Sequence, residues 1–157
     1  MVKINVIAVG KIKESYYQAG VDEYVKRLSK YAKVRIVEVK EKNLSNEPNS
    51  AEILETLKRE GEEIKKELKG ACVALAIEGK NYSSVAFAEL IKKLKDEKGE
   101  ITFVIGGSHG IDESVKNSCA EKLSFSKMTF PHTLARVMLL EQIYRAFNIL
   151  QDGKYHK

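Results

Sequence analysis

Two continuous apolar runs constrain the fold of this chain more than any other feature. Residues 72–77 read CVALAI and residues 101–105 read ITFVI, and neither run alternates apolar with polar side chains. A strand without alternation is buried on both faces, as strands of parallel sheets are. Between the runs, Ser83 or Ser84 can cap a helix that continues to about Lys95. These residues therefore predict a strand, a crossover helix and a second strand in a parallel sheet.

The rest of the chain continues this alternation of strands and helices. Apolar or alternating runs predict three more strands at 3–9, 34–39 and 123–126. The remaining predicted helices lie near Glu14 to Leu28, at Ser50 to about Leu68, from about Asp112, and at about Pro131 to Leu150. This order predicts an α/β fold with a mostly parallel sheet and helices on both faces. With 157 residues and no long linker, we expect one domain, residues 1–157.

Composition excludes several classes of protein. No apolar run approaches the roughly 18 residues of a membrane span, and the first residues are too polar for a signal peptide, so we expect a cytoplasmic protein without a membrane partner. Cys72 and Cys119 lack metal-ligand spacing and are expected as free thiols, with no metal. The net charge of +5 favours a polyanionic partner such as RNA, but only slightly.

The ends of the predicted strands are where an α/β sheet binds ligands. The first strand ends in VGKIK, which lacks the glycine spacing of a dinucleotide site, and no phosphate-binding P-loop occurs. The fourth strand ends in VIGGSHG, with Gly106, Gly107 and Gly110 close together. Such a loop either lets the backbone approach a ligand or simply makes a tight turn. The residues alone leave both interpretations open.

The last predicted helix has apolar residues on nearly every face between Leu134 and Leu150. Such a helix is buried, either within its own domain or against a second subunit. We favour the second subunit, because helices of a small α/β domain cover the sheet from outside. Glu141 and Arg145 are four residues apart in the order that favours an ion pair.

Several segments together resemble the RlmH family, the small SPOUT-class methyltransferases of bacteria. These segments are VIGGSHG, LSFSKMTFPHTLARVMLLEQIYRAF and the terminal YHK, with AVGKIK and AIEGK upstream. The resemblance runs from the first strand to the last residue, apart from a variable stretch around 40 to 70. It implies a homodimer of SPOUT-type fold with a C-terminal trefoil knot. It also implies that S-adenosylmethionine is used to methylate N3 of a pseudouridine in 23S ribosomal RNA, within the assembled ribosome.

The resemblance also assigns residues of this sequence to the site. It implies a cofactor site formed by Leu75, Gly106, Phe125, Ser126, Lys127, Met128, Thr129 and Phe130. It implies that Tyr155, His156 and Arg145 are catalytic. On the residues alone, Leu75 and the two phenylalanines would be core side chains, and residues 155–157 would be a frayed tail.

Methyl transfer to N3 requires that its proton is lost or that the resulting anion is stabilised. His109 and His132 are candidates for this role beside Tyr155 and His156, although a lone histidine is more often structural. The candidate contacts to RNA phosphates or bases are Arg136, Arg145, Lys154 and Lys157.

Two other functions compete with methyl transfer. A non-catalytic α/β dimer that binds RNA or a nucleotide would use the same basic surface and glycine loop. A flavodoxin-like or other nucleotide-dependent enzyme is allowed by the sheet, but the missing phosphate motifs oppose it.

Overall fold

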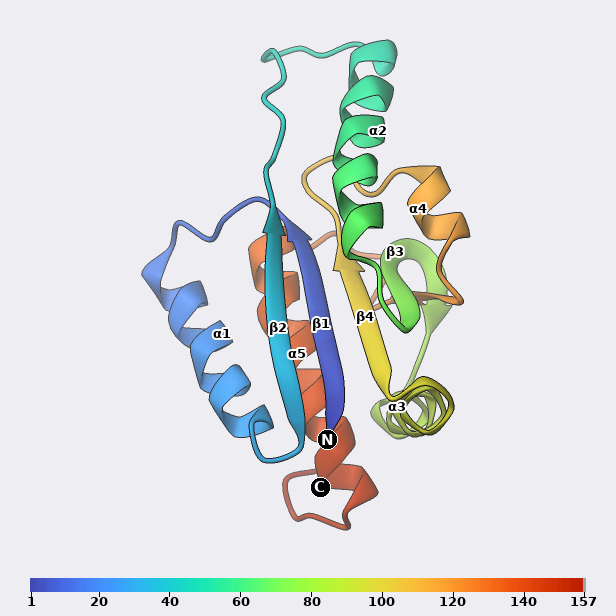
Figure 1. Cartoon of the computed structure of the whole chain (residues 1–157). Coiled ribbons are helices and arrows are strands. Elements are labelled where there is room, and N and C mark those ends of the chain that lie inside the picture. The colour runs from blue at the N-terminus through green and yellow to red at the C-terminus, as the bar shows by residue number, and fades with distance from the viewer. Residues whose placement is uncertain (157) are drawn as a thin grey trace.

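A five-stranded parallel sheet organises the chain, whose computed structural model describes residues 1–156. The strand order is β2-β1-β4-β3-β5, and every pairing is parallel (Figure 1). The prediction of an α/β fold with a parallel sheet is therefore confirmed. The strands are β1 (Val2–Val9), β2 (Ala32–Val39), β3 (Ala71–Asn81), β4 (Glu100–Ile105) and β5 (Glu121–Ser124).

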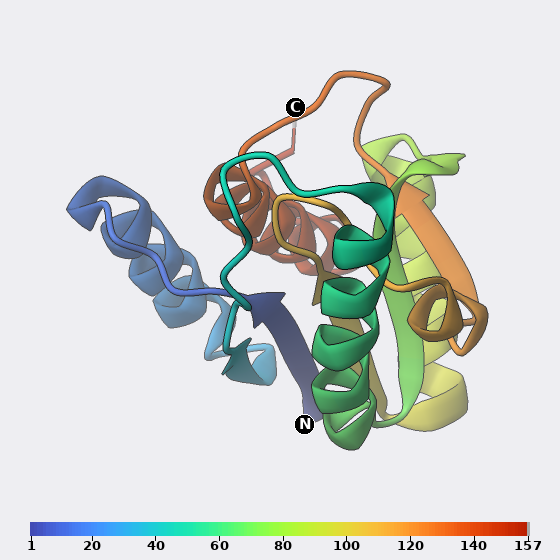
Figure 2. The same ribbon diagram turned by 90° about the horizontal axis from the view of Figure 1, so that it is seen from above.

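Helices cover both faces of this sheet (Figures 1 and 2). One apolar cluster packs α1, α3 and α5 against the sheet, and a second packs α2 and α4 against the opposite face. The helices are α1 (Ser15–Leu28), α2 (Ser50–Glu67), α3 (Ser84–Lys98), α4 (Glu113–Asn117) and α5 (His132–Leu150). Every strand and helix predicted from the sequence is present. Within residues 1–156 no helix has both the length and the apolar character needed to cross a membrane.

Helix starts agree with the predicted caps at one position and differ at another. The Ser83 hydroxyl accepts a hydrogen bond from the Ala86 N–H at 3.0 Å, which confirms Ser83 as the cap of α3. The cap of α2 is Asn49, whose Oδ1 accepts from the Glu52 N–H at 2.8 Å. Ser50, the predicted cap, is instead the first helical residue, because the Asn49 side chain satisfies the free N–H group.

The expectation that a second subunit buries the apolar residues of α5 is wrong for most of them. Leu139, Leu140 and Ile143 are fully buried within a single chain, and Tyr144 and Phe147 are nearly so. Helix α5 lies against the sheet between α1 and α3, so the chain itself covers most of its apolar surface. These residues therefore need no second subunit to bury them. The homodimer, the C-terminal knot and the single domain stay predictions.

The carboxyl end of β3 departs most from the predicted strand. β3 continues to Asn81, and its register against β5 shifts between Leu75 and Lys80, both of which pair with Leu123. Gly79 makes this possible, because a Cβ there would lie 2.7 Å from the Lys122 carbonyl. The strand thus bulges at 76–79, at the same edge of the sheet as the glycine loop after β4.

Candidate functional site

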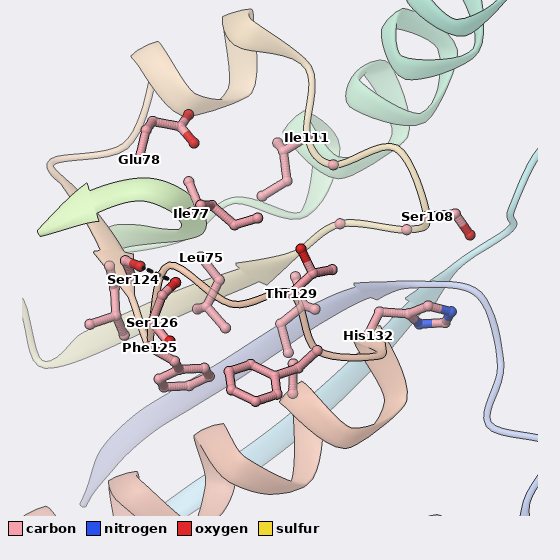
Figure 3. Close-up of a pocket in the computed structure, with 18 of the residues that line it drawn as sticks. Leu75, Ile77, Glu78, Ser108, Ile111, Ser124, Phe125, Ser126, Thr129 and His132 are labelled. Carbon is pink, nitrogen blue, oxygen red and sulfur yellow. Dashed lines mark hydrogen bonds between the residues drawn. The ribbon is translucent and has the colours of Figure 1, made fainter. Parts of the chain in front are cut away.

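A cavity of about 760 Å³ opens at the carboxyl ends of β3, β4 and β5, beside the start of α5 (Figure 3). Its walls are the bulge of β3, the glycine loop after β4, the segment after β5 and the first turn of α5. The volume is in the range of small-molecule and cofactor sites. The position agrees with the general rule for ligands of open α/β sheets.

Most of the predicted cofactor residues line this one cavity. They are Leu75, Gly106, Phe125, Ser126, Met128, Thr129 and Phe130. Lys127 is exposed and does not line the cavity. The fold therefore brings together side chains from three segments that are far apart in the sequence.

Other lining residues were missed by the sequence analysis, among them Ile77, Glu78, Ile111 and Lys116. Ile77 and Glu78 belong to the AIEGK segment, and Ile111 directly follows the glycine loop, so their positions after strands could have pointed to them. Lys116 Nζ donates to Glu78 Oε1 at 2.6 Å. This hydrogen bond lowers the pKa of Glu78, which keeps a carboxylate at the cavity wall.

The glycine loop owes its shape to contacts within the loop. A Cβ on Gly106 would overlap the carbonyl oxygen of Gly110 and come within 2.8 Å of Ile111 Cγ1. The Gly110 N–H donates to the Gly107 carbonyl at 3.1 Å, and Gly110 has a φ of +91°, which favours glycine. The tight-turn interpretation is therefore correct for Gly106, and the turn also forms part of the cavity wall.

Serine side chains shape the segment between β5 and α5. Ser124 Oγ donates to the Ser126 carbonyl at 3.0 Å (Figure 3). Ser126 Oγ accepts from the Met128 N–H at 3.0 Å. These local bonds end β5 at Ser124, two residues before the predicted end. Phe125 and Phe130 are half-buried, and Met128 is 73% exposed.

The cavity is suited to a ligand with a planar ring. Leu75, Ile77 and the two phenylalanines supply apolar walls, and the backbone of residues 125–130 offers N–H and C=O groups. Among residues 1–156 no group of three or more His, Cys, Asp or Glu side chains is arranged to hold a metal ion.

The two internal histidines lie at different depths. His132 lines the cavity, but its ring points away from the other lining side chains (Figure 3), and its Cε1 lies 3.7 Å from where a Cβ of Gly10 would stand. Its Nδ1 is buried and has no hydrogen-bond partner within residues 1–156. His109 is exposed on the glycine loop.

Arg136 does not serve the role proposed from the sequence. Its side chain is 2% exposed, with Nη1 donating to Glu38 Oε2 at 2.7 Å and Nη2 donating to the Gly10 carbonyl at 3.1 Å. The guanidinium therefore joins α5 to the ends of β1 and β2. A phosphate has no access to it in this chain.

The C-terminal segment is folded onto α5 and is not a frayed tail. The Gly153 N–H donates to the Asn148 carbonyl at 2.8 Å, and the Tyr155 N–H donates to Asn148 Oδ1 at 3.0 Å. The Tyr155 ring meets the Tyr144 ring edge to face, with centroids 4.9 Å apart. Its hydroxyl donates to Glu141 Oε2 at 3.0 Å. Burial, followed by hydrogen bonds to Tyr24 and Glu141, raises the pKa of Tyr155, so its phenol stays neutral.

The three predicted catalytic residues form one cluster with Glu141. Arg145 donates from Nη2 to Glu141 Oε2 at 2.9 Å and from Nε to Oε1 at 3.3 Å, which confirms the predicted pair. The hydrogen bond to Glu141 is the main cause of the raised pKa of Arg145. Arg145 Nη1 lies 3.1 Å from His156 Nδ1, and its guanidinium lies over the Tyr155 ring at 4.7 Å. We name these four residues the tail cluster: Glu141, Arg145, Tyr155 and His156.

The tail cluster and the cavity lie at opposite ends of α5. The first turn of the helix lines the cavity, and the tail cluster packs on its C-terminal half, where Glu141 and Arg145 lie 9 and 13 residues after His132. The 19 residues of α5 span about 28 Å, and α5 ends at the opposite end of the strands from their carboxyl ends (Figure 1). One chain therefore does not bring its own tail to its own cavity. Lys154 is exposed, and Lys157 lies outside the described residues.

Comparison with solved structures supports the fold. A probable methylase family protein from Haemophilus influenzae superposes with a TM-score of 0.53 at 10% identity. The match covers 97% of this chain and 67% of that protein.

Comparison with known sequences identifies the family. Residues 2–156 match the family model described as a predicted SPOUT methyltransferase. A protein of Carboxydothermus hydrogenoformans named ribosomal RNA large subunit methyltransferase H is 44% identical, with 99% of each chain covered. A Clostridium botulinum protein of the same name is 47% identical over 98% of this chain and 99% of that protein. This chain therefore belongs to the SPOUT methyltransferase family, among the proteins named ribosomal RNA large subunit methyltransferase H.

Proposed function

We propose that this protein transfers the methyl group of S-adenosylmethionine to N3 of a pseudouridine in 23S ribosomal RNA, within the assembled ribosome in the cytoplasm. The observation that carries the proposal is the single cavity lined by seven residues that the family resemblance assigns to the cofactor. The relatives' name, ribosomal RNA large subunit methyltransferase H, supports RNA as the acceptor.

The cavity fits the cofactor in size and in lining. Leu75, Phe125 and Phe130 would enclose the adenine ring, and backbone groups of 125–130 would bond its edge. The glycine loop would approach the ribose closely. Glu78 stays ionised beside Lys116 and would favour a positively charged ligand. The bound cofactor supplies a methyl group on a positively charged sulfur.

A second copy of the chain would complete the site. The residues proposed to act on the RNA base are Tyr155, His156 and Arg145. Arg145 lies 13 residues after His132, about 20 Å along α5, and His156 and Tyr155 contact it there. In a homodimer, the cavity of one copy could meet the tail cluster of the other. Leu134 and Met138, apolar and only half-buried, flank Ala135 at the cavity and would be part of the contact.

The test supplies methyl-labelled S-adenosylmethionine and three substrates, namely free 23S RNA, large subunits and whole ribosomes. We expect label in 23S RNA from whole ribosomes, and nucleoside mass spectrometry should place it on N3 of a pseudouridine. Label on another base would contradict the proposed acceptor. Cofactor and ribosome binding without label would favour the non-catalytic binding module instead.

A further inference from the structure

We propose that Arg145 holds His156 in the tautomer with its proton on Nε2, so that His156 donates a hydrogen bond to the target base and does not take its proton. The inference deepens the proposed function and rests on it, because it assumes that the tail cluster acts on the RNA base.

The assignment starts from one contact. Arg145 Nη1 lies 3.1 Å from His156 Nδ1, which is a hydrogen-bond distance. A guanidinium has only donor groups and stays charged in proteins, so Nδ1 must accept. A neutral imidazole whose Nδ1 accepts carries its proton on Nε2.

The guanidinium is held so that it cannot turn away from the ring. Its Nε and Nη2 both donate to Glu141, at 3.3 and 2.9 Å, in the forked arrangement typical of arginine and carboxylate. Its flat face rests on the Tyr155 ring at 4.7 Å. The remaining nitrogen, Nη1, therefore points at His156, and Arg145 acts as a positioning residue.

The hydrogen bonds of the neighbouring groups do not engage His156 Nε2. The Tyr155 hydroxyl already donates to Glu141 and lies 3.4 Å from the Tyr24 hydroxyl on α1. Arg27 of α1 lies over the rings of Tyr24 and Tyr144. His156 Nε2 has no hydrogen-bond partner among residues 1–156, so it is available to a ligand.

An N–H donor in this position serves the chemistry of N3. When the N3–H bond breaks and the proton goes to water, the electron pair stays on N3 and its charge spreads onto the flanking carbonyl oxygens. A donor at such an oxygen stabilises the anion until N3 forms its bond to the methyl carbon, while the carbon–sulfur bond of the cofactor would break and its electron pair would remain on sulfur as a neutral thioether.

The first test determines the tautomer directly. Long-range ¹H–¹⁵N NMR of the whole labelled protein at about pH 8.5, about two units above an ordinary imidazole pKa, identifies the protonated nitrogen of each neutral histidine. The spectrum of His156→Gln assigns the His156 signals. We expect the proton on Nε2 in the wild type and a mixture of tautomers in Arg145→Met. The control Arg27→Met should match the wild type. A wild-type proton on Nδ1 would overturn the proposal.

The second test separates a donor from a base. Glutamine keeps an N–H donor and an acceptor for Arg145, but it cannot take a proton. With saturating cofactor and ribosomes, we expect His156→Gln to keep a kcat at least about tenfold above that of His156→Ala, on the scale of a single catalytic group. Equal loss in both variants would show that His156 is a base. Calorimetry should give unchanged cofactor affinity in all variants. If the wild type methylates no ribosomes, the proposed function fails, whereas the tautomer measurement still stands.

Discussion

Arg136 and Arg145 lie on the same helix, and their surroundings give them different roles. Arg136 is 2% exposed and bonds Glu38 and the Gly10 carbonyl, which ties α5 to the ends of two strands. The Arg145 side chain is 24% exposed and faces the tail. Both are basic residues in one apolar segment, so residue type alone could not separate an arginine that ties a helix to the sheet from one that positions His156.

We expect Arg136→Lys to lower the free energy of unfolding by about 1.5–3 kcal/mol, the usual loss for a hydrogen bond to a charged group. A lysine ammonium cannot reach both Glu38 and the Gly10 carbonyl in the same fork. Urea unfolding measures the change. Arg27→Lys, at an exposed pair on α1, should change stability by less than about 1 kcal/mol. If Arg136→Lys had normal stability but bound ribosomes more weakly, Arg136 would be an RNA contact instead.

Glu60 is a buried carboxyl whose pKa is raised, mainly by burial. Because the pKa of Glu60 is higher in the folded than in the unfolded chain, protonated Glu60 favours the folded state. This contribution is fully present below the unfolded pKa and is lost as the pH rises through the folded pKa, where Glu60 becomes a buried carboxylate. Glu60→Gln keeps an acceptor for the Lys42 N–H and removes the charge. We therefore expect a higher Tm than wild type at pH 7, with the difference vanishing towards about pH 4. Calorimetric scans across this range measure it.

The control for Glu60 is Glu62→Gln, at an exposed position of the same helix. It should change Tm little at any pH. If Glu60→Gln and wild type had the same Tm at every pH, the buried carboxylate of Glu60 would not destabilise the folded state.

At the scale of elements, the cavity depends on two irregular connections and not on regular strands. The bulge at the end of β3 places Ile77 and Glu78 at the cavity, and the glycine loop after β4 forms the next wall. Helix α5 then begins at the cavity and carries the tail cluster on its C-terminal half, while Leu139, Leu140 and Ile143 on its inner face are fully buried. β3, β4 and α5 therefore each pack in the core and also supply part of the wall of the cavity.

We expect Gly106→Ala to weaken S-adenosylmethionine binding at least about tenfold, or about 1.4 kcal/mol. The new Cβ would overlap the Gly110 carbonyl and force the loop open. Isothermal titration calorimetry measures the affinity, with circular dichroism to check folding. Gly99→Ala is the matched control, because Gly99 has a φ of +68° but open space around it and lies far from the cavity. It should lose stability and keep affinity. Wild-type affinity in Gly106→Ala would mean that the loop does not form the cofactor site.

At the scale of the whole molecule, a single chain has its cavity at the carboxyl ends of the strands and its tail cluster further along α5, out of reach of that cavity. This separation is difficult to reconcile with a site made from one chain, because reacting groups must come within about 3.5 Å. A two-fold dimer would bring the two parts together at two equivalent sites.

Removal of residues 155–157 should leave cofactor affinity nearly unchanged and lower methyl transfer at least about tenfold, since the cavity is remote from the tail. Calorimetry and labelling of ribosomes measure the two effects. If the shortened protein methylates ribosomes at the normal rate, the tail cluster has no part in the reaction.

Mixing two inactive variants tests whether the site is shared between copies. Gly106→Ala has an impaired cavity and the shortened chain lacks a tail, so at a cofactor concentration that leaves Gly106→Ala unsaturated a mixed dimer should regain one complete site. Random assembly after co-expression should restore about a quarter of the wild-type activity. A mixture of Gly106→Ala with a second cavity variant, Phe130→Asp, should stay inactive. The shared site would be contradicted if the mixture of Gly106→Ala with the shortened chain regained no activity. It would also be contradicted if equilibrium sedimentation showed a monomer.

The sequence by itself determined the α/β class and the order of elements. The runs at 72–77 and 101–105 predicted buried parallel strands because burial on both faces excludes polar alternation. The Ser83 cap and the Glu141–Arg145 pair were equally predictable, because their partners lie within four residues along a helix. The cavity residues followed from the resemblance, since no local pattern distinguishes Leu75 from a core leucine.

Only the tertiary structure decided which groups meet across the chain. Arg136 reaches Glu38 on a distant strand, and Tyr155 reaches Tyr24 on the first helix. The same packing buries α5 within its own chain, where its pattern was equally consistent with a second subunit. Periodicity records only which face of an element avoids water, and it does not record what covers that face. The partners of buried polar groups depend on how the elements pack, and that is set by the whole chain at once.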